Sequence, residues 1–141
     1  MKETTWEQNR ELQPEDYEIR LEQLCDHVQF EGPLLSAAKD AIKGYSNELP
    51  YHNIDHMFMV AEETLALCVE YGLSVEDTQM LVMAALWHDY DYKTPLQPEY
   101  DSKEQRSAVC AYGAITKHSN DNEVFAESVA SLIISTHESE T

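Results

Sequence analysis

The feature that most constrains the fold is a run of eight consecutive apolar residues, Met80 to Trp87, followed directly by the polar pair His88 and Asp89. A run of this kind is buried on all sides, either as a strand inside a sheet or as a central helix. Its Ala, Leu and Met content, its length and the N-cap candidate Ser74 before it favour the helix. The sequence therefore predicts a central helix that ends on a histidine and a carboxylate.

Other segments repeat apolar residues at helical spacing, with Gly, Pro or Asn between them. The predicted helices are residues 14–30, 34–45, 54–71, 75–89, 102–118 and 122–138. The β-branched segment Leu132 to Thr136 could instead be a short strand, but no other segment offers it a partner. The predicted fold class is therefore all-α, a compact bundle of about five to six helices. No repeat or linker divides the chain, so residues 1–141 are expected to form a single domain.

The helix predicted for residues 54–71 is apolar on two sides. One stripe comprises Ile54, Phe58, Ala61, Leu65 and Cys68, and the opposite side carries His56 with Met59, Val60 and Leu67. A helix with two apolar sides is expected to be central in the fold. The sequence therefore places His56 inside the protein.

The charge of the chain restricts its partners. The 141 residues carry a formal net charge of −18, so nucleic acid or an anionic membrane surface would be repelled. Residues 88–118 are nearly neutral, and their basic side chains are candidates for contact with a small anion: Lys93, Lys103, Arg106 and Lys117. The alternative is that these four side chains belong to a solvated surface.

Cysteine placement and the absence of long apolar runs indicate the compartment. Cys25, Cys68 and Cys110 are far apart and odd in number, which fits reduced thiols better than a disulfide framework. No run approaches the roughly 18 apolar residues of a membrane span, and the N-terminal residues lack the apolar core of a signal peptide. A cytoplasmic protein without membrane association is expected.

The pair His88 and Asp89 is costly to bury behind an apolar run unless it is bound to something. A divalent cation would account for both, since imidazole nitrogen and carboxylate oxygen are ligands for Zn, Mn, Fe or, with more oxygen, Mg. The alternative is a helix end where His88 meets the negative end of the dipole and Asp89 is solvated. His52 and His56 add a second pair on one helix face. On its own, that spacing also fits a loop histidine followed by a hydrogen-bonded core histidine.

Two motifs together resemble a known family. The segments "YHNIDH" at residues 51–56 and "ALWHDYDY" at residues 85–92 are similar to those of the HD-domain superfamily of metal-dependent phosphohydrolases, in particular its small members that open with YHNxxH. The segments "SKEQRSA" and "LIIST" are similar to later elements of the same members. The resemblance implies a helical, metal-dependent hydrolase of a small phosphate ester, with a nucleotide or a related phosphomonoester or phosphodiester as the substrate.

The resemblance also implies a metal site. It assigns His56, His88 and Asp89 as ligands of a divalent ion, with Mn, Fe, Zn, Co and Mg all open. The family completes its ligand set with a late Asp, which this sequence does not offer in the expected context. Either His137 or Glu138, the nearest groups by position, substitutes for it, or the chain is shorter than the usual member and the fourth ligand is absent. A site of three protein ligands still holds a catalytic metal when water fills the remaining positions.

The other site residues follow partly from the resemblance and partly from charge. The resemblance implies that His52 protonates the leaving oxygen and that Glu104 positions water or another ligand near the metal. It also implies that Asn53 orders the start of its helix beside the substrate. Lys103 and Arg106 are phosphate contacts by charge alone.

The missing acid keeps a second function open. Together with the heavily acidic N-terminal half, it favours an HD domain that has lost catalysis and binds a nucleotide or a protein instead. Oxidative chemistry, as in relatives that hold two irons, needs more ligands than the sequence supplies.

Overall fold

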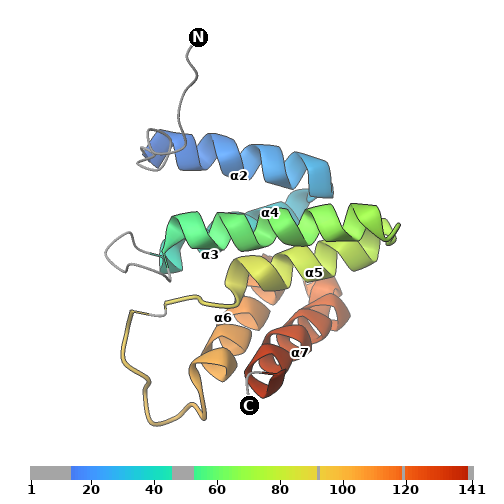
Figure 1. The fold of residues 1–141 in the computed structure, drawn as a ribbon. Helices are drawn as coiled ribbons and strands as arrows, with labels where there is room; N and C mark the ends of the chain where they lie inside the picture. Colours follow the sequence, from blue (N-terminus) through green and yellow to red (C-terminus); the bar gives the residue numbers. More distant parts are fainter. Residues whose placement is uncertain (1–13, 46–52, 92, 119, 140–141) are drawn as a thin grey trace.

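Helices make up all of the regular secondary structure of the described residues (Figure 1). The computed structural model describes residues 14–45, 53–91, 93–118 and 120–139. Its elements are α2 (Pro14–Val28), α3 (Gly32–Ala41), the 3-10 helix η1 (Ile42–Gly44), α4 (Ile54–Glu70), α5 (Val75–Trp87), α6 (Lys103–His118), the 3-10 helix η2 (Asn120–Asn122) and α7 (Glu123–Ser139). No strand occurs within these described ranges. The predicted all-α fold class is confirmed, and residues 132–136 are helical.

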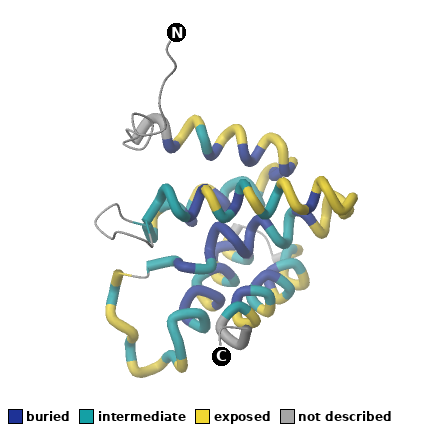
Figure 2. The backbone as a smooth tube through the Cα atoms, in the orientation of Figure 1, coloured by how far each residue is buried: buried dark blue, intermediate teal, exposed yellow. Residues whose placement is uncertain are grey.

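Helix α5 is the centre of the bundle, as the apolar run predicts. It packs against α2, α3, α4, α6 and α7. In Figure 1, α2 lies on one side of the α4–α5 pair, and α6 and α7 lie on the other. All residues from Val82 to Trp87 are buried, and they form a continuous dark stretch in Figure 2. The core cluster around them takes side chains from each of the described helices α2 to α7, which joins these helices in one packed unit.

A short turn makes α4 and α5 an antiparallel pair. Gly72 has a φ of 68°, in the left-handed region that favours glycine at the end of a helix. The amide of Leu73 then donates to the carbonyl of Cys68 at 3.0 Å, which closes the end of α4. The next helix starts at once, because the Ser74 hydroxyl accepts from the amide of Asp77 at 3.0 Å, as expected of an N-cap. The start of α4 and the end of α5 therefore lie at the same end of the pair.

Two sequence expectations need correction. The segment predicted as one helix over residues 34–45 changes after Ala41 into the 3-10 helix η1, and apolar spacing does not distinguish a tighter final turn from an α-helix. Helix α4 is not buried on both sides: Met59 is 47% exposed and Leu67 is 53% exposed. Its buried side chains are Met57, Phe58, Ala61 and Cys68. On the second apolar side, Met59 and Leu67 therefore face outward, whereas Val60 and His56 are half-buried.

None of the described helices is long and apolar enough to cross a membrane.

Candidate metal centre

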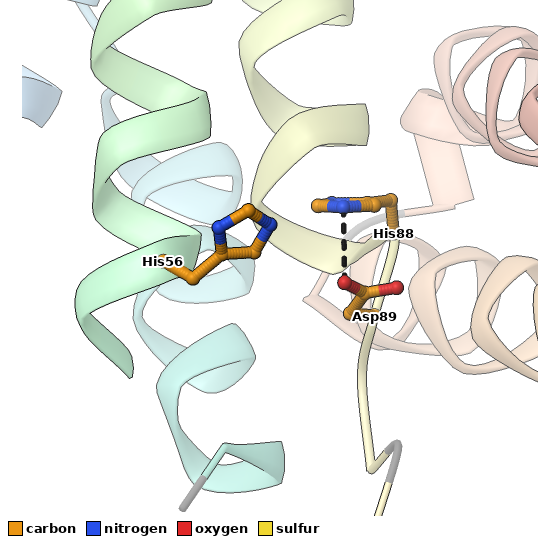
Figure 3. Close-up of side chains that lie close together, drawn as sticks. All are labelled: His56, His88 and Asp89. Carbon is orange, nitrogen blue, oxygen red and sulfur yellow. Dashed lines mark ion pairs between the residues drawn. The ribbon is translucent and has the colours of Figure 1, made fainter. Parts of the chain in front are cut away.

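His56, His88 and Asp89 come together at one end of the α4–α5 pair (Figure 3). One ligand atom from each lies within 4.8 Å of the other two, and the imidazole ring centroids are 6.4 Å apart. Within the described ranges, this is the only group of three or more His, Cys, Asp or Glu side chains that could hold a metal ion. These are the three residues for which the sequence predicts metal ligation.

The antiparallel arrangement explains why the two histidines meet. His56 lies about four helical turns before the end of α4, and His88 lies about four turns after the start of α5. The two positions are therefore level with each other across the pair. Asn53 fixes the start of α4 as its N-cap, since its Oδ1 accepts from the backbone amide of His56 at 2.9 Å. The expectation that Asn53 orders the start of this helix agrees with this contact.

Groups in and beside the candidate site bond to the last backbone carbonyls of α5. The last carbonyls of a helix have no partner within it and must find one elsewhere. The carbonyl of Ala85 lies 2.7 Å from Nδ1 of His88, and the carbonyl of Leu86 accepts from the Tyr45 hydroxyl at 2.6 Å. The carbonyl of Trp87 accepts from the amide of Tyr90 at 3.1 Å. Capping the helix thus orients the ring of His88.

The capping bond decides which nitrogen of His88 is available. A backbone carbonyl can only accept, so Nδ1 must carry the proton that it donates to Ala85. In the neutral ring, Nε2 then presents a lone pair, and it lies 3.2 Å from Oδ2 of Asp89. Two acceptors at that distance repel unless a cation or a second proton stands between them. The contact is therefore consistent with a proton between the two atoms, carried by the ring or by the carboxyl group, or with a bound metal.

The electrostatics of the site follow from burial and from Asp89. Burial lowers the pKa of His88, but the hydrogen bond with Asp89 and the charges of Asp89 and Glu104 outweigh it, so the net shift is upward. Burial, and then the charge of Asp89, raise the pKa of Tyr45 well above its ordinary value. The Tyr45 hydroxyl therefore keeps its proton and remains a donor to Leu86.

The donor set fits a divalent transition metal. Two imidazole nitrogens and one carboxylate oxygen suit Zn, Mn, Fe or Co, whereas Mg prefers more oxygen. Two ligand atoms about 2.1 Å from one ion are about 3.0 Å apart in octahedral geometry and about 3.4 Å apart in tetrahedral geometry. The 3.2 Å separation of His88 and Asp89 falls between these values. A backbone carbonyl bonded to the second nitrogen is also the usual way in which a metal-binding histidine is held.

Of the other predicted site residues, Lys103 and Glu104 lie at the start of α6. Both are half-buried in its first turn, and the charge of Glu104 acts on His88. His52 lies outside the described residues, as do the side chains of His137 and Glu138 near the end of α7. The predicted roles of these three residues stay predictions.

Arg106, predicted from its charge to contact phosphate, is buried and bonded to the loop that follows the site. The residue is only 2% exposed. Its Nη1 donates to the carbonyl of Pro95 at 3.1 Å and to Oε1 of Gln97 at 2.8 Å, and its Nη2 donates to the carbonyl of Asp91 at 2.7 Å. A buried guanidinium needs acceptors for its donors. The loop after the site supplies them for Nη1 and Nη2, whereas Nε has no hydrogen-bond partner within the described part of the chain. Arg106 therefore anchors this loop, and the prediction that it contacts phosphate stays a prediction.

Sequence reasoning missed Tyr45 as part of the centre. Its hydroxyl joins Leu86 to the amide of Asp89, which donates to it at 3.2 Å. Tyr45 is one of eight tyrosines in the chain, and none of the motifs in the sequence includes it. Nothing local marks it, since these partners are 41 and 44 residues away and the contact exists only once α3 and η1 pack near α5.

No protein-family model, no curated protein and no solved structure matches the chain.

Proposed function

We propose that this chain is a metal-dependent hydrolase of a small phosphate ester, such as a nucleotide or a related phosphomonoester or phosphodiester. The observation that carries the proposal is the meeting of His56, His88 and Asp89, with His88 held so that Nε2 faces the carboxylate. These are the residues that the resemblance to the HD-domain superfamily selects. Their convergence is an observation separate from that resemblance, which compares motifs along the chain and not distances between side chains.

In this proposal, His56, His88 and Asp89 hold one divalent ion. Such an ion would lower the pKa of a water molecule and offset negative charge on phosphoryl oxygens. The half-buried site excludes part of the solvent, which strengthens electrostatic interactions with a phosphate group. The net charge of −18 favours a small substrate over a long polyanion, because a small substrate meets only the local field of the site.

Two further residues would act on the reaction. His52 would donate a proton to the leaving oxygen, as an imidazole does well near neutral pH. Glu104 would accept hydrogen bonds from water beside His88, because its carboxylate is within electrostatic range of that ring. Lys103, next to Glu104, would contact the phosphate by charge.

The test combines metal content with turnover. The purified chain is assayed by elemental analysis, untreated and after addition of Mn, Fe, Zn, Co or Mg, and phosphate release is measured from nucleotides and simple phosphoesters. We expect Asp89→Ala and His88→Ala to lose at least about tenfold in metal affinity. We expect His52→Ala to keep the metal and to lower kcat by about 100-fold.

His27→Ala is the matched control. His27 also bonds a backbone carbonyl, that of Gln23 at 2.8 Å, but it is exposed on α2 and outside the cluster. Its replacement should leave metal content and turnover unchanged. Full metal occupancy in Asp89→Ala would refute the site. Metal or nucleotide binding without turnover on any substrate would instead support a catalytically inactive binding domain.

A further inference from the structure

The Tyr45 hydroxyl bridges the end of α5 and the backbone of Asp89. It donates to the carbonyl of Leu86 at 2.6 Å and accepts from the amide of Asp89 at 3.2 Å. Leu86 lies in the last turn of the helix, and Asp89 is the second residue beyond it. One side chain therefore ties the candidate carboxylate ligand to a rigid, buried element.

The residue before Tyr45 adds a second contact to the same turn. The carbonyl of Gly44 accepts from the amide of Asp91 at 2.8 Å. The ring of Tyr90 packs so closely on Gly44 that a Cβ at this position would collide with it. Tyr90 also meets the ring of Tyr45 edge to face, with centroids 6.5 Å apart. Residues 44–45 thus hold the turn at residues 88–91 at two points.

We propose that Tyr45 is a positioning residue that keeps the carboxylate of Asp89 beside His88 for metal binding. This inference rests on the proposed metal site. Backbone beyond the end of a helix opens more readily than the helix itself, whereas metal–ligand distances tolerate changes of only about 0.2 Å. A hydrogen bond to the Asp89 amide restricts the backbone from which the carboxylate projects. Without it, the ligand set must be ordered at the moment of binding, which weakens affinity.

Tyr45→Phe is the variant that tests the inference. It retains the aromatic ring and its packing against Tyr90, and it removes both hydrogen bonds of the hydroxyl. Tyr112→Phe is the matched control, since it removes a tyrosine hydroxyl bond to Glu123 at 3.2 Å on the surface. Dissociation constants for Zn²⁺ and Mn²⁺ are measured for the wild type and both variants by titration calorimetry. Tyr45→Phe is expected to bind about tenfold more weakly, and Tyr112→Phe as the wild type does.

A second measurement uses the metal-free chain. Amide hydrogen exchange should show the Asp89 amide protected in the wild type and in Tyr112→Phe, with faster exchange in Tyr45→Phe and unchanged exchange in the core of α5. An unprotected Asp89 amide in the wild type would overturn the inference without any variant having to fold.

The outcomes separate this inference from the proposed function. If the wild type binds metal and Tyr45→Phe binds it equally well, the positioning role is refuted while the metal site stands, even where the Tm of the variant falls. If the wild type binds no metal, both are refuted together.

Discussion

At the scale of single residues, His88 combines two tasks that usually fall to different side chains. Its Nδ1 closes the end of α5 on the carbonyl of Ala85, and its Nε2 faces Asp89. Because the hydrogen bond to Ala85 fixes the tautomer, the ring needs no further partner to direct the lone pair of Nε2 toward a metal. A glutamine could keep part of the cap but would offer an amide in place of an imidazole nitrogen. The chemistry of the centre therefore depends on the hydrogen bond from His88 to the carbonyl of Ala85, which also closes the end of α5.

Cys25 provides a prediction about pH. It is buried in α2, and burial raises the pKa of its thiol to about 11. The unfolded chain loses this proton at lower pH than the folded chain does, so the contribution of the neutral thiol to stability is complete below about pH 8.5 and is lost as the pH rises toward 11. Cys25→Ala lacks this dependence. We expect the difference in unfolding free energy between the wild type and Cys25→Ala to narrow between pH 8 and pH 10.5.

Urea unfolding with a reducing agent present would measure this difference. Val28→Ala is the control, because it removes buried volume from the same helix without removing a titratable group. Its destabilisation, about 1 to 2 kcal/mol, should stay constant over the same pH range. If the difference in unfolding free energy between the wild type and Cys25→Ala also stays constant with pH, the thiol has the same pKa in the folded and the unfolded chain.

At the scale of helices, two N-caps give a matched pair. Asn53 caps α4 and Ser74 caps α5, each through one side-chain oxygen that accepts a backbone amide. Asn53→Ala and Ser74→Ala should each lower the unfolding free energy by about 1 kcal/mol, measured by urea denaturation. Only the first should also weaken metal binding, because the amide that Asn53 holds belongs to His56. Equal weakening of metal binding by Ser74→Ala would show that affinity follows global stability alone.

The positions of helices are also the features that the sequence predicts best. The ends of α5, α6 and α7 lie within a residue or two of the predicted ones, because Ser74, Pro95, Pro98 and Asn122 interrupt strong apolar patterns. The change to η1 after Ala41 and the outward side of α4 were not predicted. Both depend on which neighbours pack nearby, which a pattern within one segment does not contain.

At the scale of the whole molecule, the candidate centre depends on packing between distant segments. The short turn at Gly72 could have predicted that His56 and His88 lie at one end of a helix pair, since their distances from that turn are nearly equal. The hydrogen bonds of Tyr45 at the end of α5, and those by which Arg106 holds the loop after the site, could not have been predicted in this way. Apart from Oε1 of Gln97, their partners are backbone carbonyls and amides, so residue type gives little indication of the pairing.

The net charge of −18 leads to a last prediction for the molecule as a whole. Self-repulsion among the acidic side chains opposes folding, and added salt screens it over distances beyond the Debye length, about 10 Å at 0.1 M. The Tm should therefore rise by several degrees between 20 mM and 500 mM NaCl, measured by calorimetry.

The ion pairs of Arg20 respond to salt in the opposite direction, because screening weakens an attraction. Arg20 joins α2 to α4 through ion pairs with Glu62 at 2.8 Å and Asp55 at 3.5 Å. Arg20→Met removes this attraction and leaves both carboxylates uncompensated, so its Tm should rise more steeply with salt than that of the wild type. A Tm that falls with salt in the wild type would mean that such ion pairs outweigh the repulsion of the net charge.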